Sequence, residues 1–296
     1  MQLRFEGAAI ALIGGDAREV ILAERLAAMG ARVKVVGLPV KCCQGIEKCT
    51  GIAGGLQGAR AVILPVPGIN DSGELYTAFI KPPPVLSVEL LSVLPPGTPV
   101  LVGVARKVLR EMTDNAGLKL IELMKLDEVA LLNSIPSAEG AIQMAMENSD
   151  ITIHGSKSLV LGFGRTGVTL ALKLKALGSR LTVVARNADQ RARAAAMGLE
   201  AADFTRLGPE ASDADFLFNT VPEIILGEGE LKGLLPSALI IDLASSPGGT
   251  NFKAAEKLGI KAILAPGLPG RVAPRTAGRI LAEVVPRILA KELALV

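Results

Sequence analysis

The chain has 296 residues, of which 50% are hydrophobic and only 3% aromatic, and its net charge is +3. This length suffices for two domains of ordinary size, and a core of Val, Leu, Ile and Ala is typical of parallel strands covered by helices on both faces. Gly, Pro or a charge interrupts each apolar run before it reaches the length of a membrane span. The small charge, with no basic stripe interleaved with aromatics, argues against a nucleic-acid-binding protein. Residues 1–13 lack the basic start and cleavage site of a secretory signal, so we expect a cytoplasmic protein.

The amino-terminal half alternates predicted strands with helical segments. The predicted strands span 8–13, 32–36, 59–65, 85–88, 99–104 and 118–123. A helix over 17–29 follows the turn Gly14-Gly15-Asp16. This alternation predicts an α/β domain with a doubly wound parallel sheet, of the flavodoxin-like kind, over residues 1–136. The turn lacks the third glycine of a dinucleotide fingerprint, so we interpret it as a turn at the cleft between two such domains.

Two predicted helices connect the domains or return to the first. A bridging helix is predicted over residues 137–150, where Ser137 can cap it and Glu139-Gly140 opens it. A last helix within 277–296, bent at Pro286, is expected to pack on the first domain.

Residues 151–276 contain the segment that is most informative about function. An apolar strand runs into Gly162-x-Gly164-x-x-Gly167, and a helical pattern follows over 168–177. Gly162 permits a tight turn, Gly164 lets the backbone approach a pyrophosphate, and Gly167 lets the helix pack closely on the strand. The phosphates would rest on the free N–H groups at the positive end of that helix. The further strands are predicted at 181–185, 216–219, 239–243 and 262–264. This context predicts a Rossmann domain, with an ordinary glycine-rich turn as the alternative.

The end of the second strand of this domain indicates which dinucleotide binds. A fold specific for NAD usually has Asp or Glu there, which bonds the ribose 2′-hydroxyl. This chain has Arg186-Asn187 instead, with Arg191 and Arg193 just beyond. A guanidinium cannot accept the ribose proton, but it can pair with a 2′-phosphate in a bidentate, charge-assisted way. We therefore predict NADP, with Arg186 as the main contact, while Arg191 or Arg193 could simply be solvated helix charges.

Ligands of open α/β sheets bind outside the carboxyl ends of the strands, and this rule, together with the glycine motif and the junction of the two domains, selects the site residues. The predicted cofactor-binding residues are Gly162, Phe163, Gly164, Arg165, Thr166, Gly167, Arg186, Asn187, Asn219, Thr220, Val221, Asp242, Leu243, Ala244 and Pro266. The predicted substrate-binding residues are Arg106, Lys107, Asn133, Ser134, Ser137, Arg271 and Arg275. Four of these residues are cations, and several cations near one crevice suit a small carboxylate substrate. We expect two of the four, which are Arg106, Lys107, Arg271 and Arg275, to be only surface charges. Asn219 and Thr220 would lie beside the nicotinamide and, with Glu139, are the catalytic candidates.

Few residues could carry proton transfer or hold a metal. His154 is the only histidine, but it precedes the fingerprint strand and would lie roughly 25 Å from the glycine turn at about 3.3 Å per residue, so we expect a structural role. Glu139 is the better acid–base candidate, with stabilisation of a helix dipole as the alternative. The cysteines Cys42, Cys43 and Cys49 lack a fourth ligand nearby, so we expect reduced thiols and no metal, with structural zinc as the alternative.

Several segments together point to one family. They are Asn133–Ile142, His154–Ser156, Leu161–Gly167, Ile241–Gly249 and Ala265–Gly278. On these segments the chain resembles the family formed by the A subunits of dipicolinate synthase from spore-forming bacteria, and the likeness covers nearly its whole length. The Gly14-Gly15-Asp16 turn and the loop 65–67 are similar to that family as well. Ser137 departs from the family's Thr but keeps the hydroxyl.

The resemblance implies an NADP-linked oxidation of a dihydrodipicolinate-level intermediate, derived from the lysine pathway, to pyridine-2,6-dicarboxylate. It also implies the flavoprotein-like B subunit of dipicolinate synthase as partner and a mother-cell cytoplasmic setting during sporulation, and we expect a homo-oligomer. A ring dicarboxylate needs at least two anion-binding groups, for which guanidinium is suited. Because aromatisation would drive the loss of hydride, the protein mainly has to orient the ring and exclude water.

Two other functions stay open. A dehydrogenase of the shikimate type is suggested by Asn219-Thr220-Val221-Pro222 and Arg186-Asn187, but it would need a Lys–Asp pair for proton relay, and Lys107 has no partner that the sequence places. The other alternative is a non-catalytic subunit that binds NADP(H) and supports a separate catalytic chain.

Overall fold

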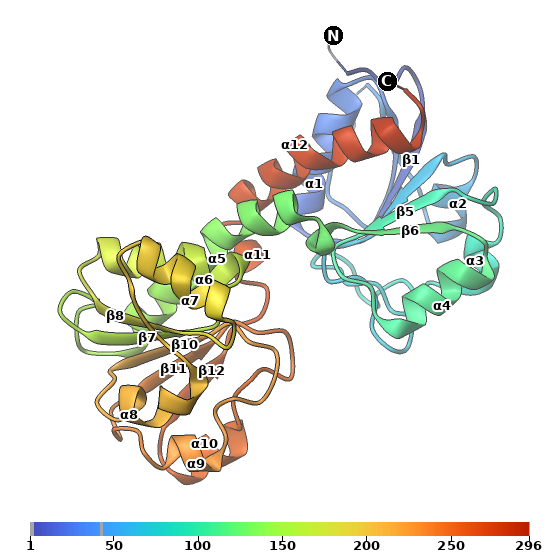
Figure 1. Cartoon of the computed structure of the whole chain (residues 1–296). Helices are drawn as coiled ribbons and strands as arrows, with labels where there is room; N and C mark the ends of the chain where they lie inside the picture. The colour runs from blue at the N-terminus through green and yellow to red at the C-terminus, as the bar shows by residue number, and fades with distance from the viewer. Residues whose placement is uncertain (1–2, 42–43, 296) are drawn as a thin grey trace. The chain divides into compact units, whose positions relative to one another are not determined.

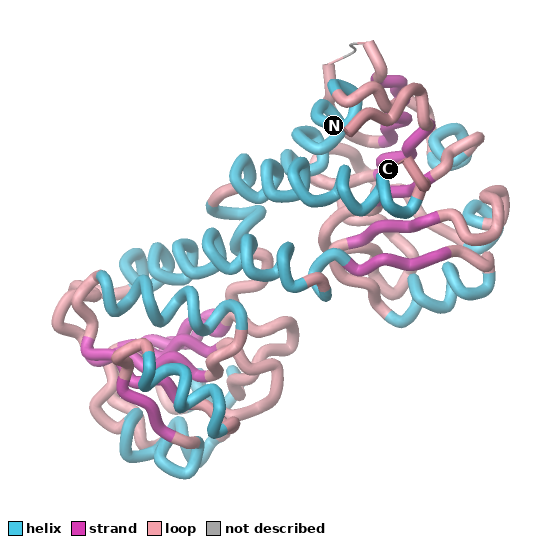
Figure 2. The backbone as a smooth tube through the Cα atoms, turned by 45° about the horizontal axis from the view of Figure 1, so that its top comes forward, coloured by secondary structure: helices cyan, strands magenta, loops and turns pink. Residues whose placement is uncertain are grey.

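The computed structural model describes residues 3–41 and 44–295. The chain forms two compact units, each with a six-stranded sheet (Figures 1 and 2). The amino-terminal unit comprises Met1–Leu132 and Ala273–Val296, and the carboxy-terminal unit comprises Asn133–Val272. No helix in the described part of the chain has the length and apolar character that crossing a membrane requires.

The amino-terminal sheet has the order β3-β2-β1-β4-β5-β6, and all its neighbouring strands are parallel. Its strands are β1 (Ala9–Ile13), β2 (Arg32–Val36), β3 (Ile46–Lys48), β4 (Ala61–Ile63), β5 (Pro99–Val102) and β6 (Lys119–Glu122). A flavodoxin-like sheet has the order 2-1-3-4-5. The short edge strand β3, which the sequence pattern does not predict, instead produces the 3-2-1-4-5-6 order of a Rossmann sheet.

Helices cover both faces of this sheet (Figure 1). They are α1 (Ala17–Ala28), α2 (Ile52–Leu56), α3 (Val88–Leu91), α4 (Lys107–Asn115) and α12 (Pro274–Glu292), with a 3-10 turn η1 (Leu123–Lys125). Consecutive residues of β1 alternate between two cores: Ile10 packs with residues of α1 and α12, and Ala11 packs with residues of α2, α3 and α4. Gly278 allows α12 to lie close to α1, because a Cβ there would be 2.7 Å from the Ile21 side chain.

One predicted strand of this unit is wrong. The segment 85–88 leads into helix α3, whose N-cap Ser87 accepts a hydrogen bond from the helix backbone. Val85 forms only an isolated bridge with Glu74. Because Ser87 caps α3 and Val88 is already helical, only Val85 and Leu86 precede the helix, which is too short a stretch for a regular strand.

The carboxy-terminal sheet has the order β12-β11-β10-β7-β8-β9, again parallel throughout. Its strands are β7 (Lys157–Leu161), β8 (Arg180–Val184), β9 (Glu200–Ala202), β10 (Phe216–Asn219), β11 (Leu239–Asp242) and β12 (Lys261–Leu264). This is the standard Rossmann order, with the switch point between β7 and β10. The predicted fold class, two doubly wound parallel-sheet domains of which the second is a Rossmann domain, is therefore confirmed.

The helices of this unit divide between the two faces of its sheet (Figure 1). One face packs with α5 (Asp127–Asn148), α6 (Arg165–Ala176), α7 (Ala188–Ala196) and α11 (Leu268–Val272), and the other with α8 (Leu207–Ala211), α9 (Glu228–Leu231) and α10 (Phe252–Lys257). A 3-10 turn, η2 (Phe204–Arg206), precedes α8.

Helix α5 begins earlier than the predicted bridging helix and runs through Pro136. Proline removes one backbone hydrogen bond from a helix. Ser137 is therefore not an N-cap: its hydroxyl donates to the Asn133 carbonyl one turn earlier, at 2.8 Å. Glu139 consequently lies inside the helix and not in its first turn, where it would stabilise the dipole. The error came from taking Ser137 as the N-cap.

Candidate dinucleotide-binding site

Gly162, Gly164 and Gly167 lie in the turn from β7 to α6, and Gly162 and Gly167 are the two that this turn requires. Gly162 has a φ of +91°, which is in the region that favours glycine. A Cβ on Gly167 would lie 2.2 Å from the Gly162 carbonyl oxygen, so helix and strand could not approach. A Cβ on Gly164 would meet no described atom within 4 Å, which leaves room against the backbone there for a ligand. Helix α6 begins at Arg165, earlier than predicted, so Gly167 belongs to its first turn.

A cleft of about 810 Å³ opens at this turn. It lies where β7, β8, β10 and β11 end at their carboxyl sides. The lining residues that the sequence predicts are Gly162, Phe163, Gly164, Arg165, Thr166, Arg186, Asn187, Thr220, Val221, Leu243 and Ala244. The remaining lining residues are Gln190, Phe204, Pro222, Glu223, Ile225 and Ser245. The carboxyl-end rule therefore brings most of the predicted cofactor residues into one cleft.

Two side chains hold the glycine turn in place. The Thr220 hydroxyl donates to the Leu161 carbonyl at 2.9 Å, which ties the end of β10 to the end of β7. Arg193 donates to the Phe163 carbonyl at 2.7 Å, and its guanidinium carbon lies 5.4 Å from the centre of the Phe163 ring. Arg193, although exposed, is thus a support of the turn.

Arg186 lies at the cleft, just after β8. Its side chain is 84% exposed and pairs with the Glu223 carboxylate, 68% exposed, at 3.6 Å. Asn187 caps α7 through its side-chain oxygen. Arg191 donates to two carbonyls of the loop before that helix, at 2.8 and 2.7 Å, so it shapes the loop that presents Arg186. Glu223 follows β10, where the sequence reasoning did not look for a cofactor-selecting charge.

Asn219 and Asp242 do not line the cleft, which corrects two predicted contacts. Both side chains are fully buried. Asp242 accepts hydrogen bonds from the Asn219 amide (3.0 Å), the Thr250 hydroxyl (2.7 Å) and two loop N–H groups (3.0 and 2.9 Å). The Asn219 amide group also bonds the Val221 backbone in both directions, at 3.0 and 2.9 Å. Since their polar atoms are used inside the protein, these two residues position the loops after β10 and β11.

The other candidates on α5 and near β12 also lie outside the cleft. Glu139 forms an ion pair with Lys173 of α6 at 2.9 Å, so the geometry does not support it as an acid–base group of this cleft. The hydroxyls of Ser134 and Thr169 lie 2.6 Å apart, again between α5 and α6. Pro266 is exposed in the loop after β12.

The four predicted carboxylate-binding cations belong to different units. Arg106 and Lys107 are exposed in the amino-terminal unit, and each pairs with a nearby carboxylate, at 3.5 and 3.6 Å. Arg275 is exposed on α12 of the same unit, whereas Arg271 is exposed on α11 of the carboxy-terminal unit. Their convergence on one crevice stays a prediction.

His154 lies before β7, at the opposite end of that strand from the glycine turn. Its Nδ1 is 3.3 Å from the Leu177 carbonyl oxygen, and a Cβ on Gly178 would lie 2.2 Å from the same nitrogen.

Cys49 is a free thiol, whereas Cys42 and Cys43 lie outside the described residues. Within 3–41 and 44–295, His, Cys, Asp and Glu form no group of three that could hold a metal ion.

The sequence reasoning also missed a buried charged cluster in the amino-terminal unit. Glu19, 1% exposed, accepts hydrogen bonds from the N–H groups of Asp16 (2.8 Å) and Val66 (3.0 Å). Asp16 pairs with Arg18 at 2.8 Å. Burial raises the pKa of Glu19 to about 7, although Arg18 opposes it. Burial also tends to raise the pKa of Asp16, but hydrogen bonds from Arg18 keep it below its usual value.

This cluster takes the place that the glycine turn has in the other unit. After β1 the chain reads Gly14-Gly15-Asp16-Ala17-Arg18-Glu19, so Asp16 and Glu19 stand at the second and third glycine positions. Their carboxylates accept from the backbone around the start of α1. An anion at this helix end would meet negative charge, so this turn is not a phosphate site. The capping-box spacing of Asp16 and Glu19 was the available signal.

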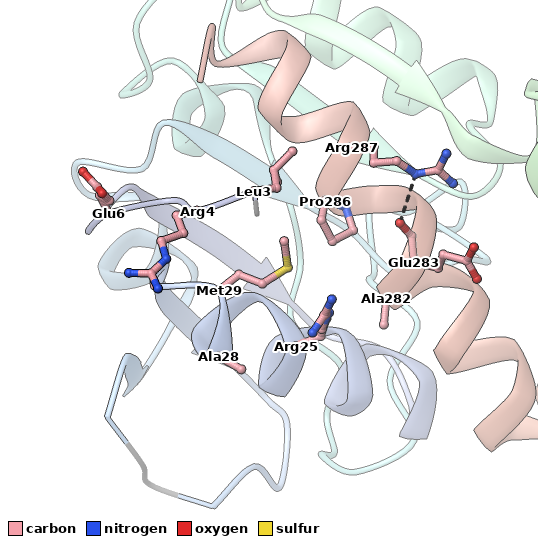
Figure 3. Close-up of a pocket in the computed structure, with 11 residues that line it drawn as sticks. Leu3, Arg4, Glu6, Arg25, Ala28, Met29, Ala282, Glu283, Pro286 and Arg287 are labelled. Atoms are coloured by element: carbon pink, nitrogen blue, oxygen red, sulfur yellow. Dashed lines mark hydrogen bonds between the residues drawn. The ribbon is translucent and has the colours of Figure 1, made fainter. Parts of the chain in front are cut away.

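A second hollow, of about 660 Å³, lies in the amino-terminal unit between α1, α12 and the segment before β1 (Figure 3). Arg25 of α1 and Met29, the C-cap of that helix, face Pro286 of α12 across it. Arg287 borders it and is already paired with Glu128. The hollow adjoins the amino ends of β1 and β2, away from the carboxyl ends where ligands of such sheets bind. It is not a candidate for the cofactor.

The sheet order, the glycine turn and the cleft define the carboxy-terminal unit as a nicotinamide-dinucleotide-binding domain of the dehydrogenase type. Residues 134–247 match the D-isomer specific 2-hydroxyacid dehydrogenase, NAD binding domain. Residues 9–124 match the N-terminal domain of the A subunit of dipicolinate synthase. Over 266 residues the chain is 41% identical to the A subunit of dipicolinate synthase from Bacillus subtilis (strain 168), covering 89% of this chain and 90% of that one. The chain therefore belongs to the family of dipicolinate synthase A subunits, and the predicted resemblance is confirmed.

Solved structures agree with this assignment. The crystal structure of the dipicolinate synthase A chain from Bacillus subtilis superposes with a TM-score of 0.93 at 40% identity, covering 100% of both chains. That of the A subunit of dipicolinate synthase from Bacillus halodurans has a TM-score of 0.93 at 38% identity, covering 97% of this chain and 99% of that one. A transhydrogenase from Sinorhizobium meliloti, at 15% identity and a TM-score of 0.69 over 95% of this chain and 92% of that one, shares the fold alone.

Proposed function

We propose that this chain oxidises a dihydrodipicolinate-level intermediate to pyridine-2,6-dicarboxylate, with NADP as the hydride acceptor. The observation that carries the proposal is the cleft of the carboxy-terminal unit, which opens onto a glycine turn at a helix start where a Cβ on Gly164 would meet no described atom within 4 Å. The family name of the relatives supplies the product, and the dehydrogenase-type domain supplies the reaction class.

The residues around the turn fit a dinucleotide. Gly164 is the N-cap of α6 and has no side chain with which to cap the helix, whereas α1 is capped by its own Asp16. Backbone N–H groups at the start of α6 could hold the pyrophosphate. Arg186 would contact the 2′-phosphate through its guanidinium. Bound there, the nicotinamide would supply a hydride acceptor at the ends of β10 and β11, where Val221 and Ala244 line the cleft.

The substrate side is proposed from charge and chemistry. Arg271 is the proposed carboxylate-binding residue of the carboxy-terminal unit, and Arg106, Lys107 and Arg275 are those of the amino-terminal unit. Aromatisation of the product favours hydride loss, so these cations mainly have to orient a dianion and keep its reacting carbon against the cofactor. Asn219 is not included because its amide is buried and bonded to the protein.

The naming of the relatives as one subunit of a synthase supports a partner. We propose the flavoprotein-like B subunit of dipicolinate synthase as that partner, and action in the mother cell of a sporulating bacterium, on the lysine pathway branch. A homo-oligomer of this chain is part of the same proposal. Co-purification of the two proteins, each with a different tag, tests the heteromeric part directly.

The test of the cofactor site compares two glycine substitutions. Both Gly164 and Gly208 are positions where a Cβ meets no described atom within 4 Å, and neither needs a positive φ. Gly164→Ala places a methyl group where the pyrophosphate would lie, while Gly208→Ala places one on α8, outside the cleft. We expect Gly164→Ala to weaken NADP binding at least tenfold and Gly208→Ala to leave it unchanged, by calorimetric titration. Equal affinities in both variants would refute the placement of the cofactor.

Turnover decides between an enzyme and a non-catalytic binding subunit. Purified chain is mixed with NADP and a freshly generated dihydrodipicolinate precursor, and NADPH formation is followed by absorbance. We expect turnover by this chain alone, reduced in Gly164→Ala at limiting NADP and reduced in Arg271→Ala. If turnover appears only when a second protein is added, and Arg271→Ala then leaves it intact, the chain is a binding subunit and not the dehydrogenase.

A further inference from the structure

We propose that Glu223 and Arg186 together select the cofactor at the ribose 2′ position, a role that rests on the proposed function of the cleft. In NADP the guanidinium of Arg186 pairs with the 2′-phosphate and the Glu223 carboxylate is displaced. In NAD the Glu223 carboxylate accepts the 2′-hydroxyl hydrogen bond. The cleft then binds both cofactors. It prefers NADP, but the Glu223 carboxylate makes this preference smaller than Arg186 alone would give.

The contact between these two side chains is the starting point. Nη1 of Arg186 lies 3.6 Å from Oε2 of Glu223, and both residues line the dinucleotide cleft. The two side chains are 84% and 68% exposed, so both charged groups are accessible to a ligand. In the described parts of the chain, neither side chain has another ion-pair partner.

The two charges come from strands that are not neighbours. Arg186 follows β8 and Glu223 follows β10, and β7 lies between these strands. Cofactor selection in Rossmann folds is usually read at the end of the second strand alone, where an acidic residue indicates NAD and an arginine indicates NADP. Here the arginine occupies that position, and an acidic group reaches the same place from another loop.

The backbone of Glu223 is held in position by a buried network. A Cβ on Gly249 would lie 2.6 Å from the Glu223 carbonyl oxygen, so the two loops are in close contact. The N–H of Ile225 donates to the Gly249 carbonyl at 2.9 Å. The N–H of Gly249 in turn donates to the buried Asp242 carboxylate at 2.9 Å. The loop that carries Glu223 is therefore anchored on its inner side, while its side chain stays exposed at the cleft.

The strength of the pair suits a displaceable contact. Exposed ion pairs shift an equilibrium by about fivefold at most. A phosphate monoester carries a charge of about −1.5 to −2 and accepts bidentate bonds from guanidinium, so it displaces a single carboxylate. The displaced carboxylate then lies near the phosphate and opposes its binding. With NAD there is no such repulsion, and the carboxylate has a hydroxyl to accept from.

Calorimetric titration of NADP and NAD tests this pair of residues, Glu223 and Arg186, which we call the selector, with three variants. Glu223→Gln removes the charge and keeps the shape, and Arg186→Gln removes the guanidinium. Glu228→Gln is the matched control, because Glu228 of α9 forms a similarly exposed pair with Lys232, the C-cap of that helix, and does not line the cleft.

We expect Glu223→Gln to tighten NADP and weaken NAD, each about fivefold, so that the ratio of their dissociation constants changes by about 25-fold at low salt. The change should shrink in concentrated salt. Arg186→Gln should weaken NADP at least tenfold and leave NAD within about twofold. The control should match the wild type.

The outcomes separate the two proposals. If the wild type binds both cofactors and Glu223→Gln leaves their ratio within twofold, the selector is refuted and the dinucleotide site stands. A wild type that binds NADP only, in a manner independent of Glu223, refutes the selector as well. A wild type that binds neither cofactor overturns the proposed function, and the selector with it.

Discussion

Glu19 is expected to make the stability of the amino-terminal unit depend on pH near neutrality. Burial raises the pKa of its carboxyl group from 4.5 to about 7, although Arg18 and the backbone N–H groups of Asp16 and Val66 favour the ionised form. A group that holds its proton more tightly in the folded state stabilises that state at low pH. The contribution of Glu19 is thus complete below about pH 4.5 and is lost as the pH rises through about 7.

The size of this effect follows from the two pKa values. The difference between about 7 and 4.5, at about 1.4 kcal/mol per pKa unit, corresponds to about 3 kcal/mol in total. About 2.5 kcal/mol of this falls between about pH 5 and about pH 8. Asp16, whose pKa is lowered, acts in the opposite direction but below about pH 4. The only histidine, His154, is in the other unit.

Tyrosine fluorescence in urea offers an assay for this unit alone. The chain has one tyrosine and no tryptophan, and Tyr76 belongs to the amino-terminal unit. We expect the free energy of unfolding to fall by about 2.5 kcal/mol from about pH 5 to about pH 8 in the wild type. The fall should disappear in Glu19→Gln and persist in the exposed control Glu111→Gln. If Glu19→Gln keeps the wild-type pH dependence, Glu19 does not titrate as the burial of its carboxyl group requires.

Three further substitutions test the carboxy-terminal unit. Gly167→Ala should force the turn apart, because its Cβ would lie 2.2 Å from the Gly162 carbonyl oxygen; we expect a loss of about 1–3 kcal/mol together with loss of NADP binding, and an unchanged thermal midpoint would count against this. Arg193→Ala removes the hydrogen bond and the ring contact to Phe163, so NADP affinity should fall about tenfold, and Arg193→Lys should retain part of it. Equal NADP affinities of the two variants, measured by calorimetry, would contradict this prediction. Asp242→Asn replaces an acceptor of four hydrogen bonds and should cost about 3 kcal/mol in circular dichroism melts, whereas a loss below about 1 kcal/mol would mean that the network is dispensable.

Local sequence patterns predicted the parts of the site that depend on neighbours along the chain. The spacing of Gly162, Gly164 and Gly167 requires a strand, a tight turn and a helix start, and these interactions span only a few residues. The end of β8 was also predictable, because strand length and the following turn place Arg186 at the carboxyl edge. The same reasoning assigned Asn219 to the cleft, since it ends β10, but it could not distinguish a side chain that faces the ligand from one that faces the core.

Errors in the helices had a local cause of a different kind. Ser137 has the side chain of an N-cap, and a helix that continues through the preceding proline is disfavoured by its own backbone. Val129, upstream of Pro136, is buried in the amino-terminal core, and Ala138 and Ala141, downstream of it, are buried against the carboxy-terminal sheet, so packing on both sides of the proline favours the continuous helix α5. Packing of this kind outweighs a local preference, and it depends on residues that are distant in sequence.

The amino-acid sequence by itself determined the doubly wound class, the glycine turn and the family, because each depends on periodicity or on short motifs. Only the tertiary structure showed that Glu223, after β10, pairs with Arg186, after the non-adjacent strand β8. It also showed that Glu19 is buried at the position where the other unit has a glycine. Both depend on contacts between loops at the ends of different strands. Such contacts are set by strand order and by the burial of charge in three dimensions, which a one-dimensional pattern does not specify.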